Sequence, residues 1–287
     1  LVVDGAVLYV RAKGRGARAL SLTDGGVYAA RDITGHAEHF FRGPASSIVS
    51  WCFQRDPWAT IWAAQADGSL LSCCRTGEST WAWAKSTTGT DKVLSVACVP
   101  EAGADVVVLA VKRGATTYLE RMTTRDLETV LPLGADAGDA AFAVDCASSH
   151  LLSGINVVDV VSGLSRFEGR DVWAVAPGNA PLGPLRVTGG SVTVGPFDKA
   201  NRADGKVLVS IGLAFTADLE TLDAVAAGRT AQKATDSVGF EVDSAQGLEV
   251  GEDFEHLTPW RSRTPANSYE FPSAASALAV VKVSGSW

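Results

Sequence analysis

The sequence of 287 residues has few of the features that define disulfide-stapled, zinc-binding or membrane-spanning proteins. It has five cysteines, an odd number without C-x-x-C spacing: Cys52, Cys73, Cys74, Cys98 and Cys146. This argues against a disulfide framework and against a zinc site, and a reducing compartment of synthesis is the simpler interpretation. No apolar run approaches the roughly 20 residues that a membrane span needs, and no signal peptide opens the sequence.

Charged residues are also scarce, at 20% of the chain, and acidic residues outnumber basic ones by 32 to 25. The resulting net charge of −7 makes the chain a poor candidate for wrapping nucleic acid by phosphate neutralisation. The charge is uneven, because residues 1–125 hold 14 basic and 11 acidic side chains, whereas residues 126–287 hold 11 and 21. We therefore expect two parts with different roles, and DNA near the protein to slide past rather than bind.

Strand patterns are abundant, and they predict an all-β fold. Short runs rich in Val, Ile, Leu, Trp and Tyr are separated by turn residues at spacings near ten, and few segments predict a helix. The composition excludes disorder, collagen and coiled coil. The sequence begins at Leu1 inside a strand-like run and stops at Trp287 without a terminal cap, so we expect a fragment of a longer protein.

The clearest hairpin joins residues 61–65 to residues 70–74 through Asp67-Gly68, a pair that accepts the positive φ values of a tight primed turn. This hairpin recurs, since a shift of 46 positions superposes it on the following segment. Each copy reads as three strands, and residues 81–86 predict a fourth strand in the first copy. Four short antiparallel strands in 40 to 50 residues are typical of a β-propeller blade. The shift superposes Ile48 on Leu94, Cys52 on Cys98, Trp62 on Val108, Ala64 on Ala110, Gly68 on Gly114 and Arg75 on Arg121.

These patterns predict three regions. Residues 1–125 form propeller-like blades, including an upstream hairpin with its turn at Gly14 to Gly16, and residues 126–152 connect them to the rest. Residues 153–287 form a small β-barrel or β-sandwich with a hairpin turn at Gly189-Gly190, an acidic hairpin at 236–255 and a C-terminal strand. A propeller needs at least about four blades, so chain absent from this sequence, or strands returning after an insertion, would complete the ring.

Candidates for catalytic chemistry are few. His36 and His39 flank Glu38 at metal-ligand spacing, but they match neither H-E-x-x-H nor its inverse, which favours a surface or packing role. Only His150 and His256 remain as bases, and no G-x-S-x-G elbow accompanies them, so a nucleophile-based enzyme is disfavoured.

Carboxylates and thiols have ordinary structural explanations too. Asp67, Glu78 and Asp105 could supply the carboxylate pair of a glycosidase, yet Asp67 and Asp105 fall in predicted hairpin turns, where Asp caps its own backbone. Cys73 and Cys74 must point to opposite faces of their strand, which favours inert, partly buried thiols.

The remaining clusters predict surface or packing. The acidic stretch lacks the spacing of a calcium loop, which favours a solvated or channel-facing surface over a metal. Residues 13–19 are basic but match no phosphate-binding loop, which favours a turn. The five tryptophans of one blade predict packing between blades. Taken together, these clusters lead us to predict no catalytic, cofactor-binding or metal-binding residue and no cofactor. The acidic residues include Asp243, Glu249, Glu252, Asp253 and Glu255, and the tryptophans are Trp51, Trp58, Trp62, Trp81 and Trp83.

Five segments resemble, in order and spacing, the tail nozzle proteins of short-tailed bacteriophages, also called tail tubular protein B-like or tail stabilisation proteins. The similarity covers roughly residues 7–255 and is strongest over 57–122. It fails after about residue 260, and the family typically has several hundred more residues. The segments are AVLYVRAKGRGARAL, ITGHAEHFFRG, PWATIWAAQADGSLLSC, residues 81–122 and VSGLSRFEGRDVWAVA.

The resemblance implies a non-enzymatic virion protein, assembled in the host cytoplasm, that forms a ring of six subunits below the tail adaptor. Such a ring has a propeller with inserted β-domains and guides the genome out of the capsid. Its expected partners are the adaptor near the portal, tail fibres or spikes, the host outer surface, and passing DNA without sequence-specific binding. The alternative is a β-propeller module that binds glycans or a surface protein, for which an aromatic-lined central pocket would be the sign.

Overall fold

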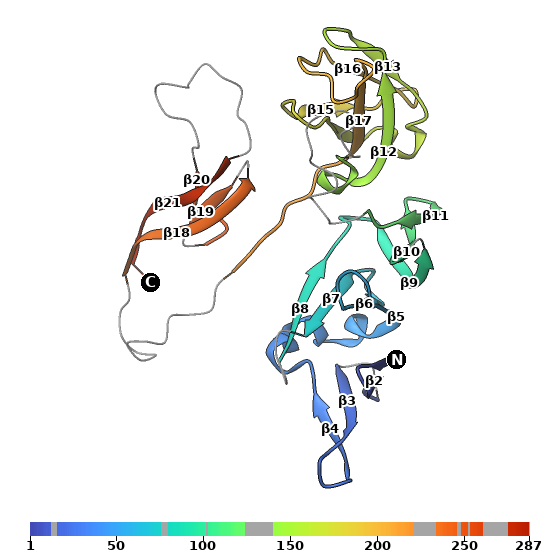
Figure 1. Cartoon of the computed structure of the whole chain (residues 1–287), viewed down its shortest axis with the longest axis vertical. Helices are drawn as coiled ribbons and strands as arrows, with labels where there is room; N and C mark the ends of the chain where they lie inside the picture. Colours follow the sequence, from blue (N-terminus) through green and yellow to red (C-terminus); the bar gives the residue numbers. More distant parts are fainter. Residues whose placement is uncertain are drawn as a thin grey trace. The chain divides into compact units, whose positions relative to one another are not determined.

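The computed structural model describes residues 1–12, 16–75, 80–101, 103–123, 140–220, 234–245, 248–251, 253–260 and 275–286. The fold is all-β, which confirms the predicted class: its sheets are small and antiparallel, and all helices in the described ranges are short 3-10 turns (Figure 1). The chain divides into two compact units, Leu1–Arg125 and Asp126–Trp287, each described by itself below.

In its described residues the first unit contains three sheets in which consecutive strands are neighbours. We call them the first, second and third sheet. A 3-10 segment, η1 (Gly35–Phe41), and a short turn, η2 (Pro44–Ser46), lie between the first and second sheets in the sequence. The first sheet has β1 (Val2–Val3), β2 (Ala6–Val10), β3 (Ala17–Leu22) and β4 (Tyr28–Asp32); the second has β5 (Ile48–Gln54), β6 (Thr60–Gln65), β7 (Leu70–Arg75) and β8 (Trp81–Ser86); the third has β9 (Lys92–Glu101), β10 (Ala104–Arg113) and β11 (Thr116–Arg121).

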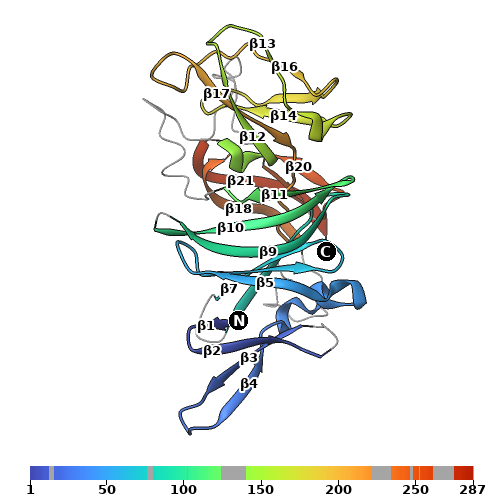
Figure 2. The ribbon, with the colours of Figure 1, turned by 90° about the vertical axis from the view of Figure 1, so that its right-hand side faces the viewer.

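The three sheets pack face to face, and the second sheet is covered on both sides (Figure 2). Because side chains alternate along a strand, Ile61 of β6 packs against the first sheet and Trp62 packs against the third. Every residue of β6 is consequently buried, although the strand is only Thr-Ile-Trp-Ala-Ala-Gln. The contacting residues include Leu8, Ala17 and Ala19 from the first sheet and Val93, Val96, Val107 and Val111 from the third.

The predicted hairpin joins β6 to β7, and β8 is the predicted fourth strand. Its turn differs from the prediction, because only Gly68 has a positive φ, of 95°. The amide of Gly68 donates to the carbonyl of Gln65 at 2.9 Å, and the amide of Gln65 donates to the carbonyl of Ser69 at 2.9 Å. This pattern is a type I turn followed by a bulge, and the carboxylate of Asp67 stabilises it by accepting from the amide of Ser69 at 2.8 Å.

The 46-residue repeat gives the correct strand order but not the register. In the second sheet Cys52 lies opposite Trp62, so the repeat would place Cys98 opposite Val108. The structure instead pairs Cys98 with Val107. A displacement by one residue turns a side chain to the other face of its strand, so Cys98 faces back toward the second sheet while Cys52 faces the third.

In the second unit, a four-stranded and a two-stranded sheet contribute to one apolar core. Val161, Val192 and Val194 of the smaller sheet pack with Val209 and Ile211 of the larger one. Two 3-10 turns, η3 (Ala140–Ala143) and η4 (Ser165–Phe167), belong to this unit. The larger sheet has the order β12 (Asp145–Leu152), β17 (Val207–Leu213), β14 (Asp171–Val175) and β15 (Leu182–Arg186), and β13 (Asp159–Val161) pairs with β16 (Val192–Val194).

Two details of this core differ from the expected boundaries. Strand β12 lies within residues 126–152, which the sequence predicts as a connection. Among the described strands it is an edge strand that pairs only with β17, and its Asp-Cys-Ala-Ser-Ser-His-Leu-Leu sequence carries little apolar alternation. The turn at Gly189-Gly190 is confirmed as a primed turn, with φ of 60° and 67°. Its flanking strands belong to different sheets, because β15 pairs with β14 and β16 pairs with β13.

The predicted acidic hairpin at 236–255 is wrong. Strand β18 (Ala234–Ala245) pairs with β21 (Ala275–Ser286), and β19 (Glu249–Gly251) pairs with β20 (Leu257–Pro259). Two twelve-residue strands form a far longer ladder than β18 could form with the three residues of β19. The predicted C-terminal strand is confirmed as β21.

Candidate functional site

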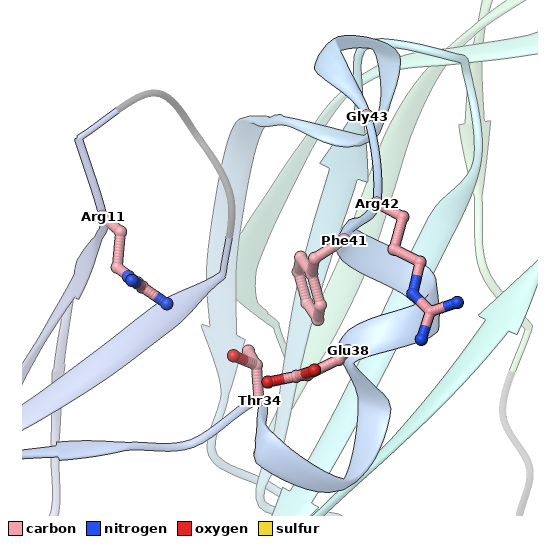
Figure 3. A pocket seen from close by; sticks show the side chains of 6 residues that line it. All are labelled: Arg11, Thr34, Glu38, Phe41, Arg42 and Gly43. Carbon is pink, nitrogen blue, oxygen red and sulfur yellow. The ribbon is translucent and has the colours of Figure 1, made fainter.

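A pocket of about 260 Å³ lies beside η1 in the first unit (Figure 3). In Figure 3 the carboxylate of Glu38 lies beside Thr34, Arg11 approaches from the first sheet, and the Arg42 guanidinium points away from Arg11. The pocket therefore has both charge signs and one aromatic wall. It is lined by Arg11, Thr34, Glu38, Phe41, Arg42 and Gly43.

Two polar side chains that line this pocket, Thr34 and Arg11, interact with the carboxylate of Asp32. The hydroxyl of Thr34 donates to Oδ1 of Asp32 at 2.7 Å, and the Arg11 guanidinium lies 3.5 Å from Oδ2 of Asp32. Burial opposes ionisation of Asp32, but the hydrogen bonds from Thr34 and the charges of Arg11 and Arg18 outweigh it and lower the pKa of this carboxyl. The pocket presents no paired nucleophile and base, so it fits a structural loop contact or a weak polar ligand.

A buried ion cluster closes the end of the third sheet. Arg113, the last residue of β10, donates from Nε and Nη2 to the two carboxylate oxygens of Glu120, and from Nη1 to Asp91 at 3.1 Å. The side chains of Arg113 and Asp91 are 2% and 3% exposed. The buried carboxylate of Asp91 and the partly buried carboxylate of Glu120 share one guanidinium, an arrangement that fixes the β10–β11 turn instead of presenting an acid and a base to a ligand.

Two cysteines meet between the second and third sheets. The sulfurs of Cys52 in β5 and Cys98 in β9 are 2.7 Å apart, and both side chains are half-buried. The sequence superposed these two positions through the repeat, but predicted no contact between them. The contact follows from the register of β9, which turns Cys98 toward β5.

A serine–histidine pair occurs in β12. The Ser148 hydroxyl and Nε2 of His150 are 2.9 Å apart, while the carboxylate of Asp253 lies against Nδ1 of His256 at 2.8 Å. Burial, and then the charge of Arg166, lowers the pKa of His150. A catalytic triad needs one histidine between the hydroxyl and the carboxylate, whereas here the hydroxyl and the carboxylate contact different histidines.

The other sequence candidates do not converge. His36, Glu38 and His39 lie exposed on η1, which is kinked at Ala37, and His39 contacts the ring of Phe40. In the residues that the structure describes, no three His, Cys, Asp or Glu side chains gather as a metal site would require.

The carboxylate candidates serve the backbone. Asp105 lies in strand β10 and not in the predicted turn; its Oδ2 accepts from the amide of Arg55 at 2.7 Å, which ties the β5–β6 loop to the third sheet. Asp67 caps its own turn and lies 3.0 Å from Nζ of Lys85. Glu78 and Glu252 lie outside the described residues.

The paired and acidic candidates have local roles. Cys73 is buried in the core between the first and second sheets and Cys74 is exposed, as the strand alternation predicts. Asp243 lies in β18 and Glu249 in β19, whereas the Asp253 carboxylate accepts from the amide of Glu255 at 2.8 Å and so caps a turn.

Four of the five tryptophans pack between sheets or against η1. Trp62 is buried against the third sheet, whereas Trp51, Trp81 and Trp83 are partly buried against the first. The indole N–H of Trp83 also donates to the carbonyl of Ile33 at 2.7 Å. Trp58 differs, because it lies in the β5–β6 loop and is 49% exposed.

The two outer faces of the three-sheet stack are apolar and exposed. On the first sheet, Leu22 lies opposite Tyr28, and both are well exposed. On the third sheet, Leu119 lies opposite Ala110 on the face turned away from the second sheet and is 81% exposed. These surfaces are more apolar than a solvent-facing sheet requires, which is typical of a contact surface. Further exposed members are Val2, Val7 and Tyr9 on the first sheet and Val99 on the third.

Comparisons with known proteins leave the family open. No protein-family model matches the chain, and no curated protein matches it either. Among the described residues, no helix has the length and apolar character that crossing a membrane requires.

Proposed function

We propose that the chain is a structural subunit of a bacteriophage tail nozzle, acting in the virion through subunit packing. The observation that carries this proposal is the face-to-face stack of repeated antiparallel sheets with an apolar, exposed face at each end. The order of its segments, which resembles the tail nozzle proteins of short-tailed phages, supports the same proposal.

The inner faces of the stack are buried by neighbouring sheets, and we infer that its apolar outer faces are buried in the same way in the assembly. Trp62 and Ala64 of the second sheet are buried by Val96 and Val107 of the third. Leu119 and Val99 lie on the other face of the third sheet, where their side chains are 81% and 48% exposed. Burying a leucine is worth about 1.5–3 kcal/mol, so several such side chains on each face favour further sheets of the same kind as the cover. In a propeller, repeated blades around an axis cover both faces of every blade, so such an arrangement would bury the apolar side chains at both ends of the stack.

In the proposed assembly, six subunits form a ring attached to the tail adaptor, with tail fibres or spikes and the host surface as further partners. The ring retains the genome and then passes it during ejection. The acidic balance of residues 126–287 supports a lumen that repels the phosphate backbone, so DNA slides through without sequence-specific binding.

A catalytic role has less support. The hydrogen-bonded Ser148–His150 pair has no carboxylate on the same histidine among the contacts described, and Asp67 and Asp105 are occupied by the backbone. The glycan-binding alternative requires an aromatic-lined pocket, whereas the pocket beside η1 has one aromatic side chain, Phe41, between two arginines.

Electron microscopy of the purified protein tests the proposal. We expect class averages with a closed ring of six similar wedges around a central opening. Averages that show only isolated particles of monomer size, together with glycan-array binding that depends on Phe41 or Trp58, would support the binding-module alternative instead.

A further inference from the structure

We propose that Cys52 and Cys98 form a thiol–disulfide exchange site, at which a reversible disulfide staples β5 of the second sheet to β9 of the third. The proposal is independent of the tail-nozzle function. Its first observation is the separation of 2.7 Å between the two Sγ atoms, which come from different sheets and from positions 46 residues apart in sequence.

The surrounding contacts hold the two sulfurs together. Two residues before the cysteines in their strands, the Ser50 hydroxyl of β5 lies 3.2 Å from both the carbonyl oxygen and the amide nitrogen of Val96 in β9. The loop before β6 is fixed to β10 through Asp105, so β5 and β9 are held in position on both sides of the cysteines. A disulfide needs a sulfur separation of about 2.05 Å, which small side-chain rotations provide from this starting point.

The other cysteines are differently placed. Cys73 lies on the opposite face of the second sheet, in the core shared with the first sheet, and its neighbour Cys74 is exposed. Cys146 belongs to the second unit. The sequence shows an odd set of five thiols, but the fold selects two of them as a pair.

The contact between the sulfurs couples the ionisation of the two thiols. Cys52 and Cys98 share a hydrogen bond that either thiol can donate; this bond outweighs burial and the charge of Asp105, and lowers the pKa of Cys98. The same hydrogen bond, with burial, raises the pKa of Cys52. Because the two sulfurs are in contact, either cysteine can attack as the thiolate and the other can then resolve the mixed disulfide.

The proposed oxidant is a small-molecule disulfide such as oxidised glutathione. The thiolate of one cysteine attacks one sulfur of the oxidant, breaks its S–S bond and releases one thiolate. The other cysteine, on losing its proton, then attacks the protein sulfur of the mixed disulfide and releases the second thiol. The two protein thiols lose two electrons and two protons, and the oxidant gains them as two thiols.

Peptide mapping tests the pairing on the intact chain. The protein is reduced, exchanged into buffers with increasing ratios of oxidised to reduced glutathione, quenched in acid, alkylated and digested with trypsin. Trypsin places Cys52 in peptide 43–55, Cys98 in peptide 93–112, Cys73 and Cys74 together in peptide 56–75, and Cys146 in peptide 126–166. We expect a linked species of 43–55 with 93–112, lighter by two hydrogen atoms than the separate peptides and converted back by a reductant.

Thermal unfolding of the same samples gives a second readout. Oxidation should raise the melting temperature of the wild-type protein by roughly 5–10 °C, because the bond closes a loop of 46 residues. Cys52→Ser and Cys98→Ser should lose this increase, while Cys74→Ser, which changes an exposed thiol on β7, should keep it. A variant that fails to fold shows this by circular dichroism under reducing conditions, and the wild-type mapping then decides alone.

Two results would overturn the proposal. One is full alkylation of both peptides 43–55 and 93–112 at the most oxidising ratio in the folded protein. The other is a linked species that joins either peptide to 56–75 or 126–166 in place of the expected pair.

Discussion

The indole N–H of Trp62 donates to Oε1 of Gln54 at 3.0 Å, and the amide group of the same glutamine donates to the carbonyl of Asp105 at 2.9 Å. Gln54 thus bridges strand β6 of the second sheet and strand β10 of the third. An apolar side chain at this position would leave the indole N–H of Trp62 and the carbonyl of Asp105 without the hydrogen bonds that Gln54 provides between the two sheets.

Gln54→Met should destabilise the first unit by about 2–3 kcal/mol, because it keeps the side-chain volume but removes both hydrogen bonds from a buried site. Urea unfolding followed by tryptophan fluorescence measures the change. Lys112→Met, on the outer face of β10, serves as the control and should shift the unfolding free energy by less than about 0.5 kcal/mol. Equal effects of the two substitutions would contradict the role given to Gln54.

Arg113 and Arg121 offer a matched comparison of a buried and an exposed ion pair. Arg113→Met should cost about 3–5 kcal/mol, because it removes the guanidinium from the buried carboxylate of Asp91. Arg121→Met removes a pair with Glu101 in which the side chains are 60% and 52% exposed, and it should cost less than about 1 kcal/mol. Denaturant midpoints of the two variants check the order, and a larger loss for Arg121→Met would refute it.

The Asp67 turn predicts an acid-dependent loss of stability. Burial opposes ionisation of Asp67, but hydrogen bonds from Ser69 and Lys85 outweigh it and lower the pKa of the folded state. The ionised carboxylate therefore stabilises the protein above the unfolded pKa of about 3.9, and this contribution disappears as the pH falls through the lower pKa of the folded state.

Unfolding free energies of wild type and Asp67→Asn from pH 7 to pH 2 provide the measurement for this effect. The wild-type advantage should be full at neutral pH and shrink below about pH 4. Asp24→Asn, in the exposed β3–β4 turn, is the matched substitution. A wild-type advantage over Asp67→Asn that grows in acid would contradict the assigned sign.

We expect the exposed outer face of the third sheet to take part in self-association of the protein. Leu119→Glu should reduce self-association at least tenfold, because it places a charge in the contact, and should leave the melting temperature within a few degrees of wild type. Leu219→Glu changes an equally exposed leucine of the second unit, 89% exposed, and should leave association unchanged. Analytical ultracentrifugation over a concentration series measures both; unchanged association of Leu119→Glu would remove this face from the assembly.

Local patterns predicted the strands of the first unit well. Alternation and turn residues located the β6–β7 hairpin, the fourth strand β8 and the division of Cys73 and Cys74 between buried and exposed faces. These features depend on residues close in sequence, so the sequence carries them directly.

Features that depend on register or on distant partners were not predictable in the same way. The repeat aligned Cys52 with Cys98, but their contact arises from a one-residue displacement in β9 that no composition or spacing reveals. The pairing of β18 with β21 joins segments thirty residues apart, so the nearer acidic segment was the wrong partner. The pocket beside η1 likewise joins Arg11 and Arg42 through the fold of the first unit.

The mass of the purified protein in solution, measured by native mass spectrometry and light scattering at several concentrations, tests the proposed assembly most directly. The proposal predicts a species of about six chains of 29.9 kDa each. A species of 29.9 kDa at every concentration, with the first unit folded, would contradict it.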